Sequence, residues 1–228
     1  PALPTEVAWY DTYPSNNNEG YDGNWGVYMF PSGKIASSDR STGLYVLKMN
    51  YNIKVAMEGF YDDVLNKLRM KDTVTAYLRN ITSPYAIIDS SKQVVDNITL
   101  TGNFEFSNAL SGTYYISLNH RNSIETWSKV NGEAYNPMTL MNYDFTSSDS
   151  KAYGNNLAQV DLSPVIFALY SGDVNQDEII DASDISTVEN AVLNSLSGYV
   201  KEDLNGDNFV DATDLSIVAN NAELAKST

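Results

Sequence analysis

The chain has 228 residues, 43% of them hydrophobic, so it is long enough to bury one large or two small cores. Its formal net charge of −15 argues against nucleic acid or an anionic membrane surface as a partner, because like charges repel. It has no cysteine, which excludes disulfides, thiolate metal sites and a cysteine nucleophile.

The negative charge is concentrated at the C-terminal end. Residues 171–228 hold 12 Asp and Glu against 2 Lys and Arg, a net charge of −10. No apolar run reaches the roughly 18 residues of a membrane helix, so we expect no membrane insertion. No signal peptide is present and the chain starts at Pro1, so we expect a processed, secreted form.

Residues 1–50 are rich in Tyr, Asn, Gly and Ser. Asn16–Gly26 is predicted to be a loop, because Asn and Gly favour turns and positive φ. Strand-like pieces lie around it at Glu6–Tyr10, Gly26–Phe30 and Gly43–Met49. The segment is either an arm or a set of extra strands of the next domain.

Residues 51–170 are predicted to form a β-sandwich, because short β-branched or aromatic runs alternate with turn residues at sandwich-like spacing. The runs are Asn52–Met57, Thr73–Leu78, Tyr85–Ile88, Phe104–Phe106, Thr113–Leu118, Ile124–Trp127 and Val165–Tyr170. Asp62–Lys71 is either one helical turn or a polar loop. The whole segment resembles the small immunoglobulin-like or transthyretin-like modules of bacterial secreted proteins.

Residues 171–228 contain two related loops, DVNQDEIIDASD (Asp173–Asp184) and DLNGDNFVDATD (Asp203–Asp214). Each places Asp, Asn, Asp, Asp and Asp at loop positions 1, 3, 5, 9 and 12. Ca²⁺ takes six to eight oxygen ligands, and this is the spacing of a twelve-residue calcium loop. The sequence therefore predicts two bound Ca²⁺ ions, which would neutralise four of the negative charges.

An amphipathic helical pattern follows each loop. The apolar positions are Ile185, Val188, Val192 and Leu196 after the first loop, and Leu215, Val218, Ala222 and Ala225 after the second. Gly198 is suited to the end of the first helix. The two helices have no other partner in the tail, so we expect them to pack on each other.

Tandem loop-then-helix units with Asp at position 12 resemble the dockerin modules of bacterial extracellular proteins, over Gly172 to about Leu224. The resemblance implies a first ion held by Asp173, Asn175, Asp177, both oxygens of Asp184 and the Ile179 carbonyl, with Asp181 acting through water. It implies a second ion held by Asp203, Asn205, Asp207, Asp214 and the Phe209 carbonyl, with Asp211 acting through water. Ile180 and Val210 would pair across the two loops and pack inward.

The sequence departs from the dockerin pattern at two kinds of position. Position 6, usually Gly because the loop turns there with positive φ, is Glu178 or Asn208. The positions that dock a cohesin partner hold Ala182–Ser183 and Ala212–Thr213, then Glu189–Asn190 and Ala219–Asn220. The basic residues common on cellulosomal dockerin helices are missing, which puts a classical cohesin in doubt.

Other chemistries have weaker signals. His120 is the single histidine, and no nucleophile motif accompanies it, so we expect a structural role. A pair of glycosidase carboxylates is not excluded, although turns and calcium ligands account for the acidic residues more simply. Trp9, Trp25 and Trp127 are either a carbohydrate platform or core residues, and core is favoured for Trp127.

We therefore predict a mainly β protein with a small α C-terminal module, divided at 1–50, 51–170 and 171–228. Its predicted function is non-catalytic, extracellular, calcium-dependent attachment to a protein partner, either cohesin-like or a sister subunit. One alternative is a self-assembling subunit of a surface filament or tube, in which the N-terminal segment completes a neighbour's sheet. The other is a carbohydrate-binding or carbohydrate-active module.

Overall fold

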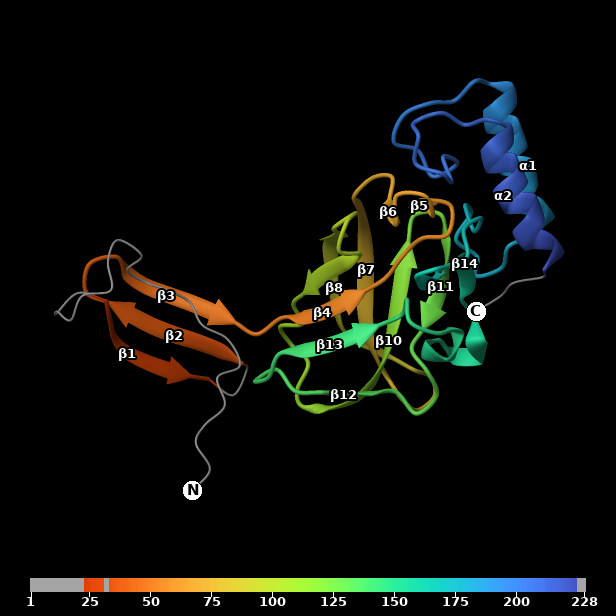
Figure 1. Ribbon diagram of the computed structural model, residues 1–228. Coiled ribbons are helices and arrows are strands. Elements are labelled where there is room, and N and C mark those ends of the chain that lie inside the picture. Colours follow the sequence, from red (N-terminus) through yellow and green to blue (C-terminus); the bar gives the residue numbers. More distant parts are fainter. Residues whose placement is uncertain (1–22, 31–32, 225–228) are drawn as a thin grey trace.

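The computed structural model describes residues 23–30 and 33–224. Three parts follow one another along the molecule (Figure 1): a small three-stranded sheet, a larger β region, and two helices at the other end. The mainly β class with an α C-terminal module is confirmed. None of the helices in the described residues has the length and apolar character needed to span a bilayer.

The first sheet is an antiparallel meander of β1 (Asn24–Met29), β2 (Lys34–Asp39) and β3 (Gly43–Lys48). Two of the strand-like pieces predicted in this segment correspond to β1 and β3, whereas β2 is a polar strand that was not predicted. The described part of this segment is a sheet of its own rather than extra strands of the central sheets. The predicted strand Glu6–Tyr10, with Trp9, lies outside the described residues.

The central region contains two main sheets. One has the order β11-β10-β7-β8, with β12 also paired to β10, and the other has the order β13-β4-β9. Two small hairpins, β5-β6 and β14-β15, complete the region. The strands are β4 (Tyr51–Lys54), β5 (Tyr61–Asp62), β6 (Lys67–Leu68), β7 (Asp72–Asn80), β8 (Ile87–Val95), β9 (Thr101–Phe104), β10 (Gly112–His120), β11 (Ser123–Trp127), β12 (Glu133–Tyr135), β13 (Met141–Asp144), β14 (Ala158–Leu162) and β15 (Val165–Ala168).

The core lies between these sheets because side chains alternate across each strand. Along β7 the burial alternates strictly, with Val74, Ala76 and Leu78 at 0–1% exposure and their neighbours partly exposed. Facing residues such as Ile53 and Ile116 are fully buried in the same cluster. This arrangement is consistent with the predicted sandwich. One pair, β4 with β13, is parallel.

The segment Asp62–Lys71 is neither a helical turn nor a plain polar loop. It contains most of the hairpin β5-β6, in which Tyr61 pairs with Leu68. The turn is organised by the Asp62 carboxylate, which accepts hydrogen bonds from the backbone N–H groups of Val64 (3.1 Å) and Leu65 (2.9 Å). Asn66 completes the turn at φ 52°, a conformation that Asn tolerates better than most residues.

The C-terminal module consists of two loop–helix units with helices α1 (Ala182–Leu193) and α2 (Ala212–Glu223), which pack on each other as predicted. The first helix is shorter than the apolar pattern suggested. It ends at Leu193, Ser195 adopts φ 51°, and Leu196 accepts a hydrogen bond from the Val210 N–H (3.0 Å). Gly198 is therefore not the residue that ends the helix, because its segment pairs with the second loop instead.

Candidate functional site

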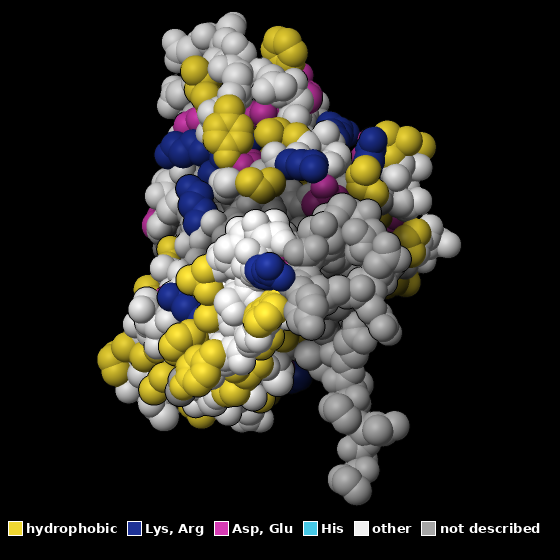
Figure 2. Space-filling model, turned by 90° about the vertical axis from the view of Figure 1, so that its left-hand side faces the viewer, with side chains coloured by type: hydrophobic (Ala, Val, Ile, Leu, Met, Phe, Trp, Pro, Cys, Tyr) yellow, Lys and Arg dark blue, Asp and Glu magenta, His cyan; other side chains and the backbone are white. Residues whose placement is uncertain are grey.

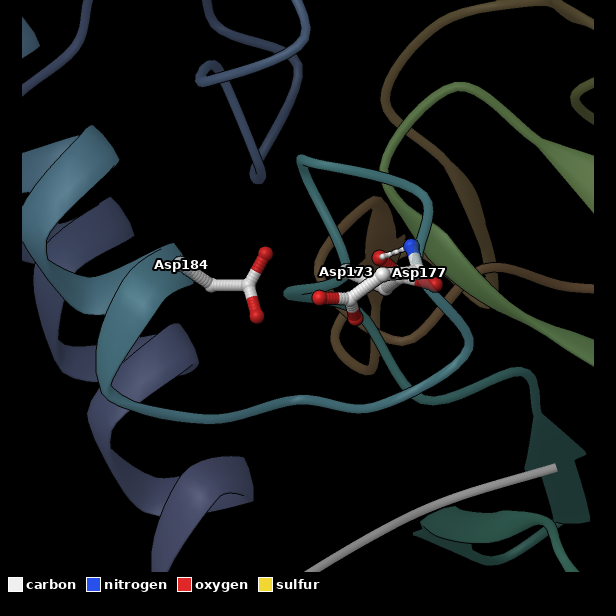
Figure 3. Close-up of side chains that lie close together, drawn as sticks. All are labelled: Asp173, Asp177 and Asp184. Carbon is white, nitrogen blue, oxygen red and sulfur yellow. Dashed lines mark hydrogen bonds between the residues drawn. The ribbon is translucent and has the colours of Figure 1, made fainter.

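The first acidic loop brings three predicted ligands together (Figure 3). Asp173, Asp177 and Asp184 each have a carboxylate oxygen within 4.8 Å of the others. Asp184 reaches the loop from the first turn of α1, and Asp173 and Asp184 are buried (1% and 0% exposed). Carboxylates gathered in this way repel one another, which makes the cluster suited to a divalent cation.

Backbone N–H groups hold these carboxylates in place. Asp184 Oδ1 accepts hydrogen bonds from Val174 (2.9 Å) and Asn175 (3.1 Å), and its Oδ2 accepts one from Asp181 (3.0 Å). Asp173 accepts hydrogen bonds from the N–H groups of Asp177 and Glu178, both at 3.2 Å. The loop therefore wraps around its own carboxylates, which fixes where their remaining lone pairs can bind a cation.

The second loop repeats this pattern thirty positions later. Asp214 Oδ1 accepts hydrogen bonds from Leu204 (2.7 Å) and Asn205 (3.0 Å), and its Oδ2 accepts one from Asp211 (2.9 Å). Asp203 accepts hydrogen bonds from the Asp207 (3.2 Å) and Asn208 (3.1 Å) N–H groups. Position-by-position agreement between the loops means that the sequence repeat is also a structural repeat.

The remaining predicted ligands have local roles in the loops. In each loop the position-3 Asn donates to the position-5 Asp, from Asn175 to Asp177 (2.9 Å) and from Asn205 to Asp207 (3.0 Å). The position-9 residues Asp181 and Asp211 cap the helices through the N–H groups of Ser183 and Thr213, both at 2.7 Å. The side chains of Ile179 and Phe209 are exposed (46% and 64%), so any role in binding belongs to their carbonyls.

Burial changes the acidity of the loop carboxylates. Desolvation, together with the nearby Asp184 charge, raises the pKa of Asp173 to about 6. Desolvation also raises the pKa values of Asp184, Asp203 and Asp214 above their usual range. A bound cation would reverse this effect, because an opposite charge favours the ionised form. Protons and a cation therefore compete for these carboxylates, and a bound cation would keep them ionised.

The loops turn at position 6 with positive φ, although neither residue there is Gly. Glu178 has φ 72° and Asn208 has φ 71°. Position 4 also has positive φ, at Gln176 (61°) and Gly206 (74°). Ile180 and Val210 are both buried in one cluster, as expected. The Val210 N–H donates to the Leu196 carbonyl, and the Asn208 carbonyl accepts a hydrogen bond from the Gly198 N–H. This part of the second loop therefore pairs with residues 196–198 rather than with Ile180.

The second loop is also attached to the β region, which the sequence did not indicate. The buried Asn122 side chain donates to the Asp203 carbonyl (2.9 Å). Gly59 lies so close that a Cβ there would be 2.1 Å from the Leu204 carbonyl oxygen. Farther along, Asn221 in α2 donates to Ser171 O (2.7 Å) and to the Glu58 carboxylate. These contacts join residues far apart in the chain, and no local pattern reveals them.

His120 lies in a buried network beside this contact. Its Nδ1 is 3.1 Å from Ser123 Oγ and its Nε2 is 3.3 Å from Asp72 Oδ2. All three residues are buried (1%, 0% and 3% exposed), so the Ser123 hydroxyl is not accessible to a substrate. The Asp72 carboxylate also accepts hydrogen bonds from Arg121 (2.8 Å) and from the Tyr199 hydroxyl.

The charges in this network favour a structural role. Burial lowers the pKa of His120, so the ring is neutral near pH 7. Burial alone would raise the pKa of Asp72, but contacts with His120 and Arg121 hold it well below its usual range. The Arg121 guanidinium also lies 4.4 Å from the centre of the Tyr199 ring. The network thus connects β7 and β10 to the segment between the two calcium loops.

Comparison with known proteins gives one family match and distant structural likenesses. Two mutants of a type II cohesin–X–dockerin complex from Acetivibrio cellulolyticus resemble 76% of this chain. The C-terminal interface mutant has 14% identity, 94% of its chain covered and a TM-score of 0.45. The N-terminal interface mutant has 15% identity, 92% covered and a TM-score of 0.39. At these TM-scores the likeness carries no argument about this chain.

No curated protein matches the chain. The family match is confined to the C-terminal module, less than half of the chain, and agrees with the loop geometry described above. Dockerin domains bind calcium and are non-catalytic interaction modules. Residues 171–223 match the dockerin type I domain, and a β-rich region precedes this module.

Proposed function

We propose that this chain is a non-catalytic, extracellular protein that attaches to a cohesin-like partner through a dockerin module loaded with two Ca²⁺ ions. The observation that carries the proposal is the repeated loop, in which two sets of carboxylates are held by equivalent backbone hydrogen bonds. The proposed ligands are the twelve loop residues predicted from the sequence. The proposed division of the chain stays at 1–50, 51–170 and 171–228.

The proposed docking surface is accessible. Ala182 and Ser183 in the first unit are exposed, as are Ala212 and Thr213 in the second. The contacts with the β region involve other residues, such as Leu204 and Asn221. Attachment of the module to the β region therefore leaves the predicted docking positions free for a partner.

Calcium-dependent binding to a panel of immobilised cohesin domains tests this function. We expect saturable binding to at least one cohesin with Ca²⁺ and none after chelation. The double variant Ala182→Arg, Ala212→Arg should weaken binding at least about tenfold, because it places a bulky charge in both docking positions. Glu223→Ala, at an exposed position away from the loops, is the control. Calcium-independent binding, or binding unaffected by the double variant, would contradict the proposal.

Self-assembly is a second candidate because of the exposed apolar residues of the β1–β3 sheet. Trp25, Val27, Leu44 and Val46 are 63–69% exposed. Figure 2 looks onto this end of the molecule and shows hydrophobic side chains at its surface. Particle mass with Ca²⁺ and with chelator separates the candidates: polymers that are lost in Val27→Lys, Val46→Lys support assembly, and a monomer in both conditions supports docking alone.

A further inference from the structure

A pocket of about 440 Å³ lies on the face of the β11-β10-β7-β8 sheet that points away from the central core. Its lining includes four aromatic residues, one carboxylate and one amide: Tyr85, Tyr115, Trp127, Tyr153, Glu125 and Asn156. None of these residues belongs to the calcium loops. The pocket is therefore a site that calcium-dependent docking does not explain.

Strand register places part of this lining on one face. Tyr115 pairs with Arg79, and Ser117 pairs with Trp127, so these four side chains point to the same side of the sheet. Glu125 lies two residues before Trp127 on β11 and shares that side. The intervening residues Leu78, Ile116 and Leu118 point the other way, into the core. Tyr85, from the β7–β8 connection, and Tyr153, from the 3₁₀ helix Tyr153–Asn155, complete the lining.

The carboxylate that lines the pocket, Glu125, is paired with the guanidinium of Arg79 on β7. Arg79 Nη2 lies 3.0 Å from Glu125 Oε1, and both side chains are mostly buried (18% and 11% exposed). Arg79 Nε donates to Ser117 Oγ (2.8 Å), and its guanidinium lies 4.9 Å from the centre of the Trp127 ring. Because Arg79 neutralises Glu125, the pocket offers a carboxylate acceptor without a net charge.

Two pairs of the aromatic residues that line the pocket meet edge to face. Tyr85 meets Trp127 at 88° with 5.7 Å between ring centres, and Tyr115 meets Tyr153 at 88° with 6.3 Å. Tyr85 and Tyr153 are 42% and 56% exposed, so their rings border solvent. The indole Nε1 of Trp127 is buried and has no hydrogen-bond partner among the described residues.

We propose that this pocket binds a neutral saccharide. A sugar ring presents C–H faces that contact aromatic rings and hydroxyl groups that both donate and accept hydrogen bonds. The pocket supplies both partners: four rings, the Glu125 carboxylate and the Asn156 side-chain amide. The ligand is neutral because the charged groups of the site already form a pair.

Other ligand classes fit less well. A cation would find the Glu125 carboxylate already neutralised by Arg79, whose guanidinium also occupies a cation–π position on Trp127. An anion would meet the Glu125 carboxylate in a chain with a net charge of −15. A purely apolar side chain would cover the Glu125 carboxylate and the Asn156 amide without giving them new partners, at a cost in desolvation. A polyhydroxylated neutral ring avoids all three problems.

Calorimetric titration of the calcium-loaded full chain with cellohexaose, xylohexaose and mannohexaose tests the proposal. We expect at least one of them to bind at a single site, and Tyr153→Ala to weaken binding at least about fivefold through loss of an exposed ring. Glu125→Gln keeps the shape of the site but removes its anionic acceptor, and should also weaken binding. Tyr28→Ala, at a 62% exposed ring on the β1–β3 sheet, is the matched control and should bind like the unmodified chain.

Two outcomes would overturn the proposal. One is the absence of binding to all three hexasaccharides up to roughly 5 mM, a concentration that detects even weak single-site binding. The other is saturable binding of tetramethylammonium that Tyr153→Ala abolishes, which would make the pocket a cation cage. Unfolding temperature and calcium stoichiometry of each variant show that it is folded, and these readouts do not depend on cohesin docking.

Discussion

The two acidic loops have nearly the same local structure but different surroundings. Both hold the position-12 Asp with three backbone N–H groups, and both turn with positive φ at positions 4 and 6. Position 3 is exposed in the first loop (Asn175) but only 2% exposed in the second (Asn205). The same motif thus forms one loop in which positions 3 and 4 are exposed and one in which they are buried, although both loops contact the β region, the first through Gln176.

The residues at position 4 of the two loops, Gln176 and Gly206, reflect this difference in burial. In the second loop Gly206 lies against Met70, and a Cβ there would be 3.2 Å from Met70 Cγ. In the first loop Gln176 has room for a side chain, which donates to the Asp173 carbonyl (2.6 Å) and accepts from Asn119 (2.8 Å). Gly suits position 4 of the second loop because the site is tight and φ is positive, whereas the exposed position 4 of the first loop holds a larger residue at similar φ.

Loss of the position-12 carboxylate should have the largest effect on the free energy of unfolding, and the size of the effect should differ between the two loops. Asp214→Ala leaves the N–H groups of Leu204, Asn205 and Asp211 without their acceptor, which we expect to lower the free energy of unfolding by about 3 kcal/mol or more. Asp184→Ala should cost less, because water can reach the exposed Asn175. Urea unfolding in Ca²⁺ measures both, with Glu223→Ala as the control. Equal losses would show that packing on the β region does not strengthen the second loop.

Exchanging the residues at position 4 sharpens the comparison. Gly206→Gln should lower the free energy of unfolding by about 2 kcal/mol, because it adds strain at φ 74° and a tight contact with the Met70 side chain. The reciprocal change, Gln176→Gly, removes hydrogen bonds but relieves strain at φ 61°, so we expect a change within about 1 kcal/mol. Thermal unfolding measures both variants. Equal losses of stability would contradict the difference between the two loops at position 4.

The pH dependence of the metal-free protein should reveal the first loop's carboxylates. The folded-state pKa of Asp173 is raised to about 6, so its ionised form destabilises the folded state above that pH, and the penalty disappears as pH falls toward the usual pKa near 4. In calcium-free buffer Asp173→Asn should therefore melt several degrees higher than the unmodified chain at pH 7, with a difference that shrinks below about pH 6 and is lost below the usual pKa near 4. With Ca²⁺ the order at pH 7 should reverse, because the variant loses a charged ligand.

The informative quantity is the difference in stability between Asp173→Asn and the unmodified chain at each pH, since His120 also affects stability between pH 4 and pH 7. Burial lowers its folded-state pKa, so the unfolded chain takes up the proton first as pH falls, which destabilises the folded state. That contribution is the same in both proteins and cancels in the comparison. A stability difference that did not change with pH would contradict the raised pKa of Asp173.

The smallest expected effect is on calcium affinity through the contacts outside the loops. Asn122→Ala removes the hydrogen bond to the Asp203 carbonyl and should lower the affinity of the second site about three- to tenfold without affecting the first. Asn119→Ala removes the partly exposed contact with Gln176 and should change neither site by more than about twofold. Calorimetry with two resolved binding steps measures both variants. Equal effects would mean that neither contact matters for binding.

Local features of the fold were predicted well. The loop spacing of Asp and Asn gave two loop–helix units in the right register, because ligand spacing and helix capping are both local properties. Alternating β-branched runs such as Thr73–Leu78 correspond to real strands for the same reason. The short hairpin β5-β6 and the polar strand β2 were missed, since neither has the apolar alternation that signals a strand.

The sequence by itself determined the two acidic loops, the paired helices and the mainly β character, because these depend on residues close together in the chain. Only the tertiary structure decided that Asn122 and Gly59 support the second loop, and that Tyr85, Glu125, Trp127 and Tyr153 surround one pocket. Those residues meet because strand order and register bring distant segments side by side. Register is a cooperative result of packing the whole sheet, and no single run of residues specifies it.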